Sequence, residues 1–348
     1  MPPRTRKDVK MSHALEIEKL KVRFWSTNLL KILIGKDPYQ IIEAVSDVSL
    51  RIEQGSILGL VGESGCGKTT VARSIIGLNT PQAGSIRFAG KELVGLSQKE
   101  FKPVRRQIAM MFQDPNGSLS PRFSVKELIT EPFKIHGENG DDVNLEDEAR
   151  RLLNMVGLPP ESFMGRAPHQ LSGGQARRVG VARALALSPK FIIADEPTAG
   201  LDVSVQGEIL NLCTRIKKEK NVGFLIITHN LAVIRHVSEK LAVMYLGKIV
   251  EKGNTDEIFS SPRHPYTLAL LSAHSHVNSE NGNKRIELKG DIPSLLKRPT
   301  GCEFHPRCPF SQKICRHEAP PLQREGGGHE YTCHYPLQQG CPSSGPKR

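Results

Sequence analysis

The stretch GESGCGKTT, residues 62–70, lies between the apolar run SILGLVG, residues 56–62, and the helical pattern VARSIIGL, residues 71–78. A strand, a glycine loop and a helix in that order present backbone N–H groups at a helix N-terminus, where the dipole favours anions. A chance glycine-rich turn is the alternative, and the flanking strand and helix argue against it. The sequence therefore predicts a phosphate-binding loop with these residues: Gly62, Glu63, Ser64, Gly65, Cys66, Gly67, Lys68, Thr69 and Thr70.

The spacing G-x-x-x-x-G-K-T gives this loop two further groups. Lys68 is expected to reach the β- and γ-phosphates of a nucleotide. The hydroxyl of Thr69 is expected to ligate Mg²⁺. The loop thus predicts nucleotide binding rather than the binding of a simple anion.

A pair of acids follows a second apolar strand in KFIIADEPTAGLD, residues 190–202. Asp195 is expected to hold Mg²⁺ through water, and Glu196 to orient and deprotonate an attacking water molecule. Two solvated acids at the end of a strand are the alternative. The phosphate-binding loop elsewhere in the chain favours the catalytic interpretation.

A second glycine-led helix is predicted in LSGGQARRVGVARALAL, residues 171–187, with Ser172 as its N-cap. Its N-terminus is another anion-binding site, far along the chain from the first. One phosphate group does not need two such sites, so this segment calls for a further explanation.

The composition is that of a globular protein able to bury a core: 348 residues, 38% hydrophobic and 24% charged. The length suggests two domains, or one large domain with an extension. No apolar run approaches the roughly 20 residues that cross a bilayer, and the basic N-terminal stretch lacks the apolar core of a secretory signal. We therefore expect a cytosolic chain with reduced thiols. The net charge of +12 suits phosphate-rich ligands, nucleic acid or an anionic membrane, or merely a solvated basic surface.

With LSGGQ added to the loop and the acid pair, the chain resembles the ATP-binding-cassette ATPases. In that family, LSGGQ of one protomer closes on the nucleotide held by the phosphate loop of the other. The resemblance implies that nucleotide contacts are made in this way by Ser172, Gly173, Gly174 and Gln175. Because the chain has one copy of each motif, it also implies a dimer, homomeric or heteromeric, with ATP and Mg²⁺ in composite sites.

Other motifs of the family occur in the expected order. Gln113 in MMFQDP matches the Q-loop glutamine, which contacts Mg²⁺ and the γ-phosphate side of the site. His229 in FLIITHN matches the switch histidine at the γ-phosphate, and Asp202 matches the D-loop at the dimer interface. Tyr39 stands at about the distance of the adenine-stacking aromatic, although packing beside a strand is the alternative.

The resemblance implies an α/β fold of the P-loop NTPase cassette type. This fold comprises a RecA-like core, an antiparallel β subdomain and a helical subdomain, here followed by a small cysteine-containing C-terminal extension. The expected organisation is a basic tail over 1–12, an ATP-binding domain over 13–261 with its helical subdomain at about 115–175, and the extension over 262–348. SVKELITEPFKIH and LEDEARRLLNMVGL have helical periodicity in the helical subdomain, which in the family receives coupling helices of membrane subunits.

Three segments resemble the oligopeptide/dipeptide and nickel importer branch: QDPNGSLSPRFSV, SPRHPYTLALLSA and LKGDIPSLLKRPTGCEFHPRCPF. The resemblance implies an ATPase that powers peptide import from the cytoplasmic face of the cell membrane as a peripheral subunit. Implied partners are a second cassette ATPase, two permeases and, indirectly, an extracytoplasmic substrate-binding protein, with no nucleic acid. Nickel and oligosaccharide importers share similar ATPases. A non-transport cassette protein acting on DNA or ribosomes, or a P-loop kinase, explains these segments less well.

The tail carries Cys302, Cys308, Cys315 and Cys333, separated by five, six and seventeen residues. Structural zinc sites use cysteine pairs separated by about two to four residues, so these spacings disfavour zinc. Iron–sulfur ligation by four thiolates accepts more varied spacings. The resemblance implies a [4Fe–4S] cluster in some family members, and packed reduced cysteines remain the alternative.

Overall fold

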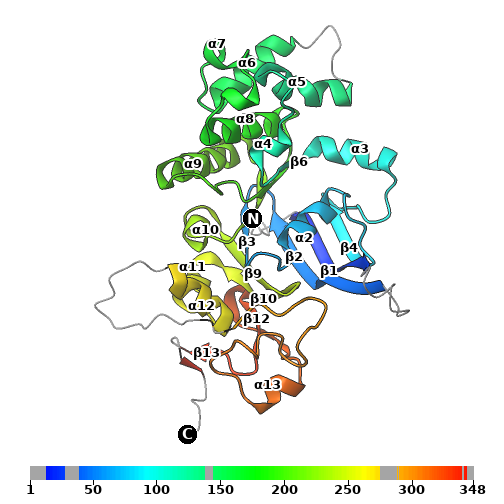
Figure 1. Ribbon diagram of the computed structural model, residues 1–348, viewed down its shortest axis with the longest axis vertical. Helices are drawn as coiled ribbons and strands as arrows, with labels where there is room; N and C mark the ends of the chain where they lie inside the picture. The colour runs from blue at the N-terminus through cyan, green and yellow to red at the C-terminus, as the bar shows by residue number, and fades with distance from the viewer. Residues whose placement is uncertain are drawn as a thin grey trace, which may run out of the picture.

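The structure is a computed structural model, and it describes residues 13–27, 39–137, 144–274, 288, 290–338 and 341–342. Within these residues, an antiparallel sheet formed near the N-terminus lies beside a larger mixed sheet, and helices gather at the end opposite the C-terminal region (Figure 1). The mixed α/β class predicted from the sequence is confirmed.

The antiparallel sheet has the strand order β2-β1-β4-β5. Its strands are β1 (His13–Thr27), β2 (Tyr39–Glu53), β4 (Ala83–Phe88) and β5 (Lys91–Glu92). These strands form the antiparallel β subdomain that the family resemblance implies. Apolar side chains such as Leu15, Ile17 and Leu20 are at most 1% exposed, as expected for the inner face of a half-buried sheet.

The mixed sheet has the order β11-β12-β10-β9-β3-β8-β7-β6, and β9, β3, β8, β7 and β6 run parallel to one another. Its strands are β3 (Ile57–Val61), β6 (Ile108–Met111), β7 (Phe191–Asp195), β8 (Gly223–Thr228), β9 (Lys240–Tyr245), β10 (Lys248–Asn254), β11 (Leu322–Arg324) and β12 (Glu330–Thr332). Every residue of β3, β7 and β8 is buried, the pattern of parallel strands covered on both faces. The carboxyl ends of β3 and β7, where the predicted motifs lie, therefore meet at one edge.

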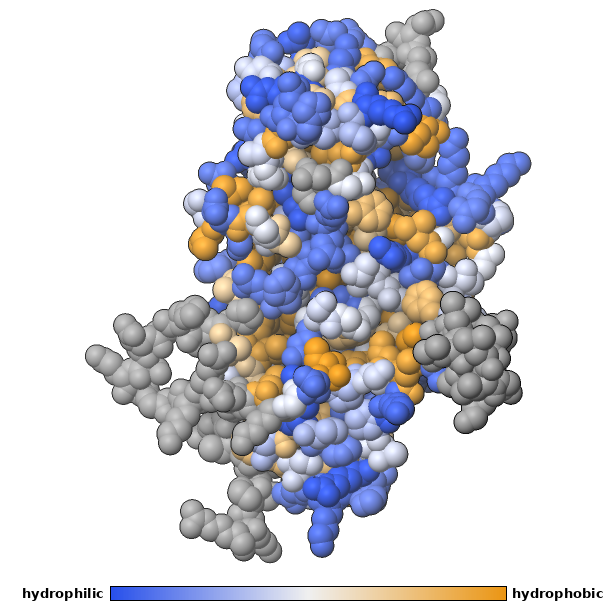
Figure 2. Space-filling model, in the orientation of Figure 1, coloured by the Kyte–Doolittle hydropathy of each residue, from blue (hydrophilic) through white to orange (hydrophobic). Residues whose placement is uncertain are grey.

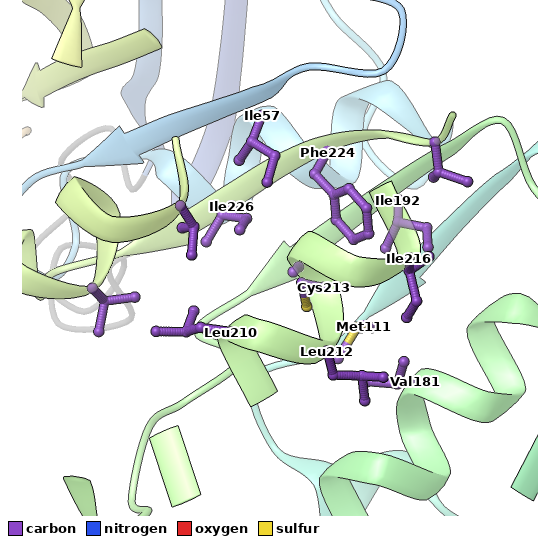
Figure 3. Close-up of a cluster of buried hydrophobic side chains, with 14 of the residues drawn as sticks. Ile57, Met111, Val181, Ile192, Leu210, Leu212, Cys213, Ile216, Phe224 and Ile226 are labelled. Carbon is purple, nitrogen blue, oxygen red and sulfur yellow. The ribbon is translucent and has the colours of Figure 1, made fainter. Parts of the chain in front are cut away.

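Helices cover this sheet and bury its core. They are α2 (Lys68–Ile75), α3 (Gln98–Gln107), α9 (Val203–Lys220), α10 (Leu231–Val237), α11 (Thr255–Ser260) and α12 (Pro265–His274). Figure 3 shows the face of α9 that carries Leu210, Cys213 and Ile216 directed towards Phe224 and Ile192 of the sheet. The helical face and the strands thus share one hydrophobic core.

The helical subdomain lies at one end of the molecule (Figure 1). It consists of α4 (Pro115–Ser118), α5 (Val125–His136), α6 (Leu145–Met155), α7 (Pro160–Phe163), the 3₁₀ turn η1 (Pro168–Gln170) and α8 (Gly173–Leu185). Ser124 and Ser172 cap α5 and α8 through capping boxes, and Asn144 caps α6. The helices predicted from periodicity in this region are confirmed.

The C-terminal region adds α13 (Lys313–His317), the 3₁₀ turn η2 (Gly326–Gly328), β13 (Leu337–Gln338) and β14 (Cys341–Pro342). It is joined to the cassette because β12 pairs with β10, with Tyr331 opposite Glu251. The domain boundary at residue 262 stays a prediction.

Hydrophilic residues cover both ends of the face seen in Figure 2, and hydrophobic residues lie in smaller groups between them. No helix within the described ranges has the length and apolar character needed to span a bilayer.

Candidate active site

The phosphate-binding loop joins β3 to α2. Gly62, Gly65 and Gly67 have φ angles of 158°, 79° and 106°. A Cβ atom on Gly62 would lie 2.2 Å from the carbonyl oxygen of Met244, and one on Gly67 would lie 2.4 Å from that of Ala44. The first and last of these positions therefore require glycine for space, and the positive φ angles favour it at all three.

Lys68 lies within this loop and is 8% exposed. Its ammonium donates hydrogen bonds to the carbonyl oxygens of Gly62, at 2.7 Å, and Glu63, at 2.9 Å. These bonds curl the loop around a positive charge, which suits it to an anionic ligand.

The loop opens onto a cavity of about 530 Å³. Its lining residues come from the strand ends and the loops around them: Ala44, Gly62, Glu63, Ser64, Gly65, Gly67, Lys68, Thr69, Thr70, Gln113, Asp195, Glu196, His229 and Leu270. The fold thus brings most of the predicted residues of one chain together at one cavity.

Asp195 ends β7 beside the loop and is 2% exposed. Thr69 hydrogen-bonds its carboxylate, whereas Oδ1 has no hydrogen-bond partner among the described residues. Burial raises the pKa of this carboxyl above its ordinary value, because the charged form is desolvated. A buried carboxylate oxygen without a partner, next to a hydroxyl, is an oxygen donor set that Mg²⁺ prefers, so these residues fit the ion.

Glu196 follows directly and is 8% exposed. Its carboxylate lies 2.8 Å, Oε1 to Nδ1, from His229 and accepts a 3.2 Å hydrogen bond from the hydroxyl of Thr228. The imidazole of His229 is largely exposed, with 64% of its side-chain surface accessible. One carboxylate is therefore fixed from two sides at the mouth of the cavity, as expected for a group that orients a water molecule.

Gln113 is exposed just after β6, and an arginine that the sequence analysis did not single out holds its backbone. Arg177 of α8 is 3% exposed and donates to the carbonyl oxygens of Phe112, Gln113 and Ala199, at 3.0, 2.5 and 3.4 Å. Burial lowers the pKa of its guanidinium from the ordinary value. The only sequence signal for Arg177 is a charge between the apolar positions of a helix.

The LSGGQ residues form the first turn of α8. The Ser172 hydroxyl accepts from the backbone N–H of Gln175 at 3.3 Å, and the Gln175 side chain accepts from the N–H of Ser172 at 3.0 Å. None of Ser172, Gly173, Gly174 and Gln175 lines the 530 Å³ cavity. Within one chain, this segment is therefore separate from the phosphate loop.

Three further predicted residues have no described place in the cavity lining. Cys66 is 4% exposed within the phosphate-binding loop. Asp202 occupies the N-cap position of α9 without capping it through its side chain. Tyr39 begins β2, and its side chain lies outside the described part of the structure.

Residues 45–199 match the ABC transporter family, and residues 250–315 match the C-terminal region of oligopeptide/dipeptide transporters. The chain is 44% identical to the oligopeptide transport ATP-binding protein AppF of Bacillus subtilis, over 84% of this chain and 89% of that protein. This chain belongs to the ABC transporter family. It is accordingly an ATPase of the cassette type, for which ATP and Mg²⁺ are implied.

Other comparisons agree with this family assignment. The oligopeptide transport ATP-binding protein OppF of Haemophilus influenzae is 41% identical, over 92% of this chain and 96% of its own length. A solved dimeric cassette, MJ0796 in a post-hydrolysis state with ADP and Pi, has a TM-score of 0.60 at 28% identity and covers 69% of this chain and 98% of its own. CbiO1 of Clostridium perfringens has a TM-score of 0.58 at 28% identity, covering 71% and 91%. The predicted cassette fold is confirmed.

The four cysteines of the extension in this ABC protein line one small cavity of about 20 Å³. Burial raises the pKa of the Cys308 and Cys333 thiols to about 12, and the neighbouring cysteines add to the shift. Among the described residues, no group of three or more Cys, His, Asp or Glu is arranged to hold a metal ion. Spacings of five, six and seventeen residues gave no sign in the sequence that the four would share one cavity.

Proposed function

We propose that this chain is the ATP-hydrolysing subunit of an ABC importer for di- or oligopeptides. The observation that carries the proposal is the arrangement at one cavity of Lys68, Thr69, Asp195, Glu196 and His229, in a cassette with the peptide-transporter type of C-terminal region. Each residue would act through the group that it presents there.

In this proposal, Lys68 leaves the loop carbonyls and binds the β- and γ-phosphates of ATP. Glu196, held by Thr228, accepts the proton of the water that attacks the γ-phosphate, while His229 and Gln113 position that water and phosphate. Thr69 and Asp195 would hold Mg²⁺, which when bound neutralises charge on the phosphates.

The segment Ser172–Gln175 would complete the site of a second cassette. Its separation from the cavity of its own chain, and the dimeric state of the solved relative MJ0796, support this arrangement. The helix N-terminus of α8 would then face the phosphates of the opposite subunit. Asp202 is proposed for the same interface and Tyr39 for the adenine, because their motif positions match those of the family.

Substitution of the proposed base tests the chemistry. Glu196→Gln should lower ATP turnover by about 10²- to 10⁴-fold while leaving ATP binding largely intact. Lys68→Ala should instead weaken binding itself in a titration with a fluorescent nucleotide. Glu161→Gln, at a 73% exposed side chain of the helical subdomain, is the matched control. Normal turnover of Glu196→Gln in the assembled transporter would refute the assignment.

A second cavity, of about 320 Å³, lies between the helical subdomain and β6. Its apolar wall includes Phe112, Ile135, Ala184 and Leu187, with Arg106 at the same cavity. Phe112 and Ile135 are 39% and 57% exposed. We propose that a short cytoplasmic helix of a permease docks here, beside Gln113, so that closure of two cassettes moves the membrane subunits. The chain would therefore sit at the cytoplasmic face of the cell membrane.

Co-purification tests the partners. Tagged Glu196→Gln protein, trapped with ATP and Mg²⁺ in detergent-solubilised membranes, should recover two permeases and a second cassette by mass spectrometry. Adding Ile135→Asp should remove the permeases and keep the second cassette. Leu322→Asp, at a 53% exposed leucine of the extension, should change neither.

The solute follows from the same complex. Peptide is proposed because the relatives above are named for oligopeptide transport. The recovered substrate-binding protein can then be titrated with di- and oligopeptides. If the substrate-binding protein bound only a nickel chelate or only an oligosaccharide, that compound would replace peptide as the proposed solute. Recovery of only ribosomal or DNA-associated proteins in the co-purification would reject a transport function.

We also propose that Cys302, Cys308, Cys315 and Cys333 ligate a [4Fe–4S] cluster, because all four line one cavity and four thiolates are the donor set of such clusters. The cavity has room for about one water molecule, so the turns that carry the cysteines would have to move apart for a cluster to bind. Iron and sulfide analysis of anaerobically purified protein tests this, with Cys315→Ser expected to lose the iron and Cys213→Ser, in the α9 core, to keep it. Iron-free protein in which Cys302, Cys308, Cys315 and Cys333 are all free thiols would favour packed reduced cysteines.

A further inference from the structure

Glu63, the second residue of the phosphate-binding loop, is held by an arginine of the C-terminal extension. Arg307 donates two parallel hydrogen bonds to its carboxylate, Nη1 to Oε2 at 2.6 Å and Nη2 to Oε1 at 2.9 Å. The Arg307 side chain is 6% exposed and that of Glu63 is 22% exposed. Such a two-pronged pair fixes the direction of the carboxylate as well as its distance.

The backbone of Glu63 is held at the same time. Its N–H donates to the hydroxyl of Tyr266, in α12, at 2.9 Å, and its carbonyl oxygen accepts from Lys68 at 2.9 Å. Tyr266 is fully buried, and its ring packs against those of Tyr245 and Phe304, with centroids 4.7 and 5.4 Å apart. All three polar groups of Glu63 are therefore occupied, two of them by side chains that lie after residue 261.

The negative charge of Glu63 makes its pairing with Arg307 important for nucleotide binding. Glu63 lines the same cavity as Lys68 and Thr69, so an uncompensated carboxylate there would repel the phosphates of a nucleotide. The hydrogen bonds to Glu63 raise the pKa of the Arg307 guanidinium, which stays charged. Arg307 thus supplies the opposite charge while turning the carboxylate towards the extension.

We propose that Arg307 is a positioning residue for ATP binding, which acts through Glu63 by neutralising its carboxylate and holding the first turn of the phosphate-binding loop. The proposal deepens the ATPase function proposed above and rests on it. It makes the C-terminal extension part of the nucleotide site, although none of the extension residues that the structure describes after α12 lines the cavity. Arg307 itself does not touch the reacting atoms.

The test is a double-mutant cycle, with the Kd measured on the purified full-length chain and KM and kcat measured in the assembled transporter. Arg307→Gln should raise the Kd and KM for Mg-ATP by about 10- to 30-fold, because a charge-assisted pair is lost beside the phosphates. Its kcat should change by less than about threefold, since no catalytic group is removed. Glu63→Gln alone supplies the reference Kd, and Arg307→Gln combined with Glu63→Gln should bring the Kd to within about threefold of that reference.

This rescue separates positioning from a general structural role. If Arg307 only stabilised the fold, the double variant would bind ATP no better than Arg307→Gln. Arg307→Lys, which keeps the charge but loses the two-pronged geometry, should fall between the wild type and Arg307→Gln, and it replaces Arg307→Gln if that protein does not fold. Arg324→Gln is the matched control, because the Arg324 side chain is 72% exposed and forms an ion pair with Glu330 in the same extension.

Two outcomes would overturn the proposal: an ATP Kd for Arg307→Gln equal to that of Arg324→Gln, or no recovery in the double variant. Failure of the ATPase assignment looks different. In that case Glu196→Gln would leave turnover unchanged, whatever the Kd of the Arg307 variants.

Discussion

Glu196 has a backbone φ of 49°, in the left-handed region that residues with a Cβ atom rarely adopt. Such a conformation costs about 1–3 kcal/mol. Its N–H donates to the carbonyl oxygen of Ile227 at 2.8 Å, and Thr228 and His229 hold its side chain. These contacts offset the cost and leave the proposed base a single orientation.

Two glycines of the phosphate-binding loop separate two costs of adding a Cβ atom: the strain of a positive φ angle and the clash with a neighbouring atom. Gly65→Ala should cost about 1–2 kcal/mol from its positive φ alone, because its Cβ would meet no atom within 4 Å. Gly67→Ala should cost more and abolish ATP binding, since its Cβ would press on the carbonyl oxygen of Ala44. Thermal unfolding and nucleotide titration of both variants measure this, and equal losses of stability would contradict it.

At the scale of elements, α5 and α8 begin with the same capping box, built by Ser124 with Glu127 and by Ser172 with Gln175. Ser124→Ala and Ser172→Ala should each destabilise the protein by about 1 kcal/mol, because each leaves a helix N–H without its acceptor. Only Ser172→Ala should also lower ATP turnover, measured in the assembled transporter, if α8 faces a nucleotide of the partner. An equal loss of turnover in both variants would mean that Ser172 acts only as the N-cap of α8 and does not contact nucleotide.

How much of the site the sequence predicts depends on how its residues are spaced. Lys68 and Thr69 belong to one continuous loop, and Asp195 and Glu196 stand at the carboxyl end of one strand, so local pattern and strand order predict that they lie together, as the structure has them. Arg307 reaches Glu63 across 244 residues of chain, and that contact exists only after the extension packs on the cassette. No periodicity or spacing carries this information, and the same holds for the convergence of the four cysteines.

At the scale of the whole molecule, His264 lies at the junction of the cassette and the extension. It is 1% exposed, its ring packs against Phe304, and its Nδ1 accepts from the N–H of Tyr266 at 3.1 Å. Burial lowers its pKa from 6.5 to about 4. The neutral imidazole is therefore part of the folded junction.

Because this pKa is lower in the folded than in the unfolded chain, its contribution to stability is present above pH 6.5 and is lost as the pH falls towards 4. The loss should reach about 3 kcal/mol. His264→Asn, which keeps an acceptor near the Nδ1 position, should reduce the acid sensitivity of unfolding measured by denaturant titration. The exposed His317→Asn should not, and identical pH profiles for the wild type and His264→Asn would contradict the prediction.

The pairing of β12 with β10 has one more consequence, for shortened forms of the chain. β10 is an inner strand only because β12 lies against it, through Glu251 opposite Tyr331 and Lys252 opposite Glu330. The fully buried Glu251 also accepts a 2.8 Å hydrogen bond from His329. A chain cut after the cassette would expose the unpaired edge of β10 and leave the Glu251 carboxylate without His329. Exposed sheet edges promote the pairing of one molecule with the next. Proteolysis of this extension would therefore yield aggregates rather than a smaller working motor.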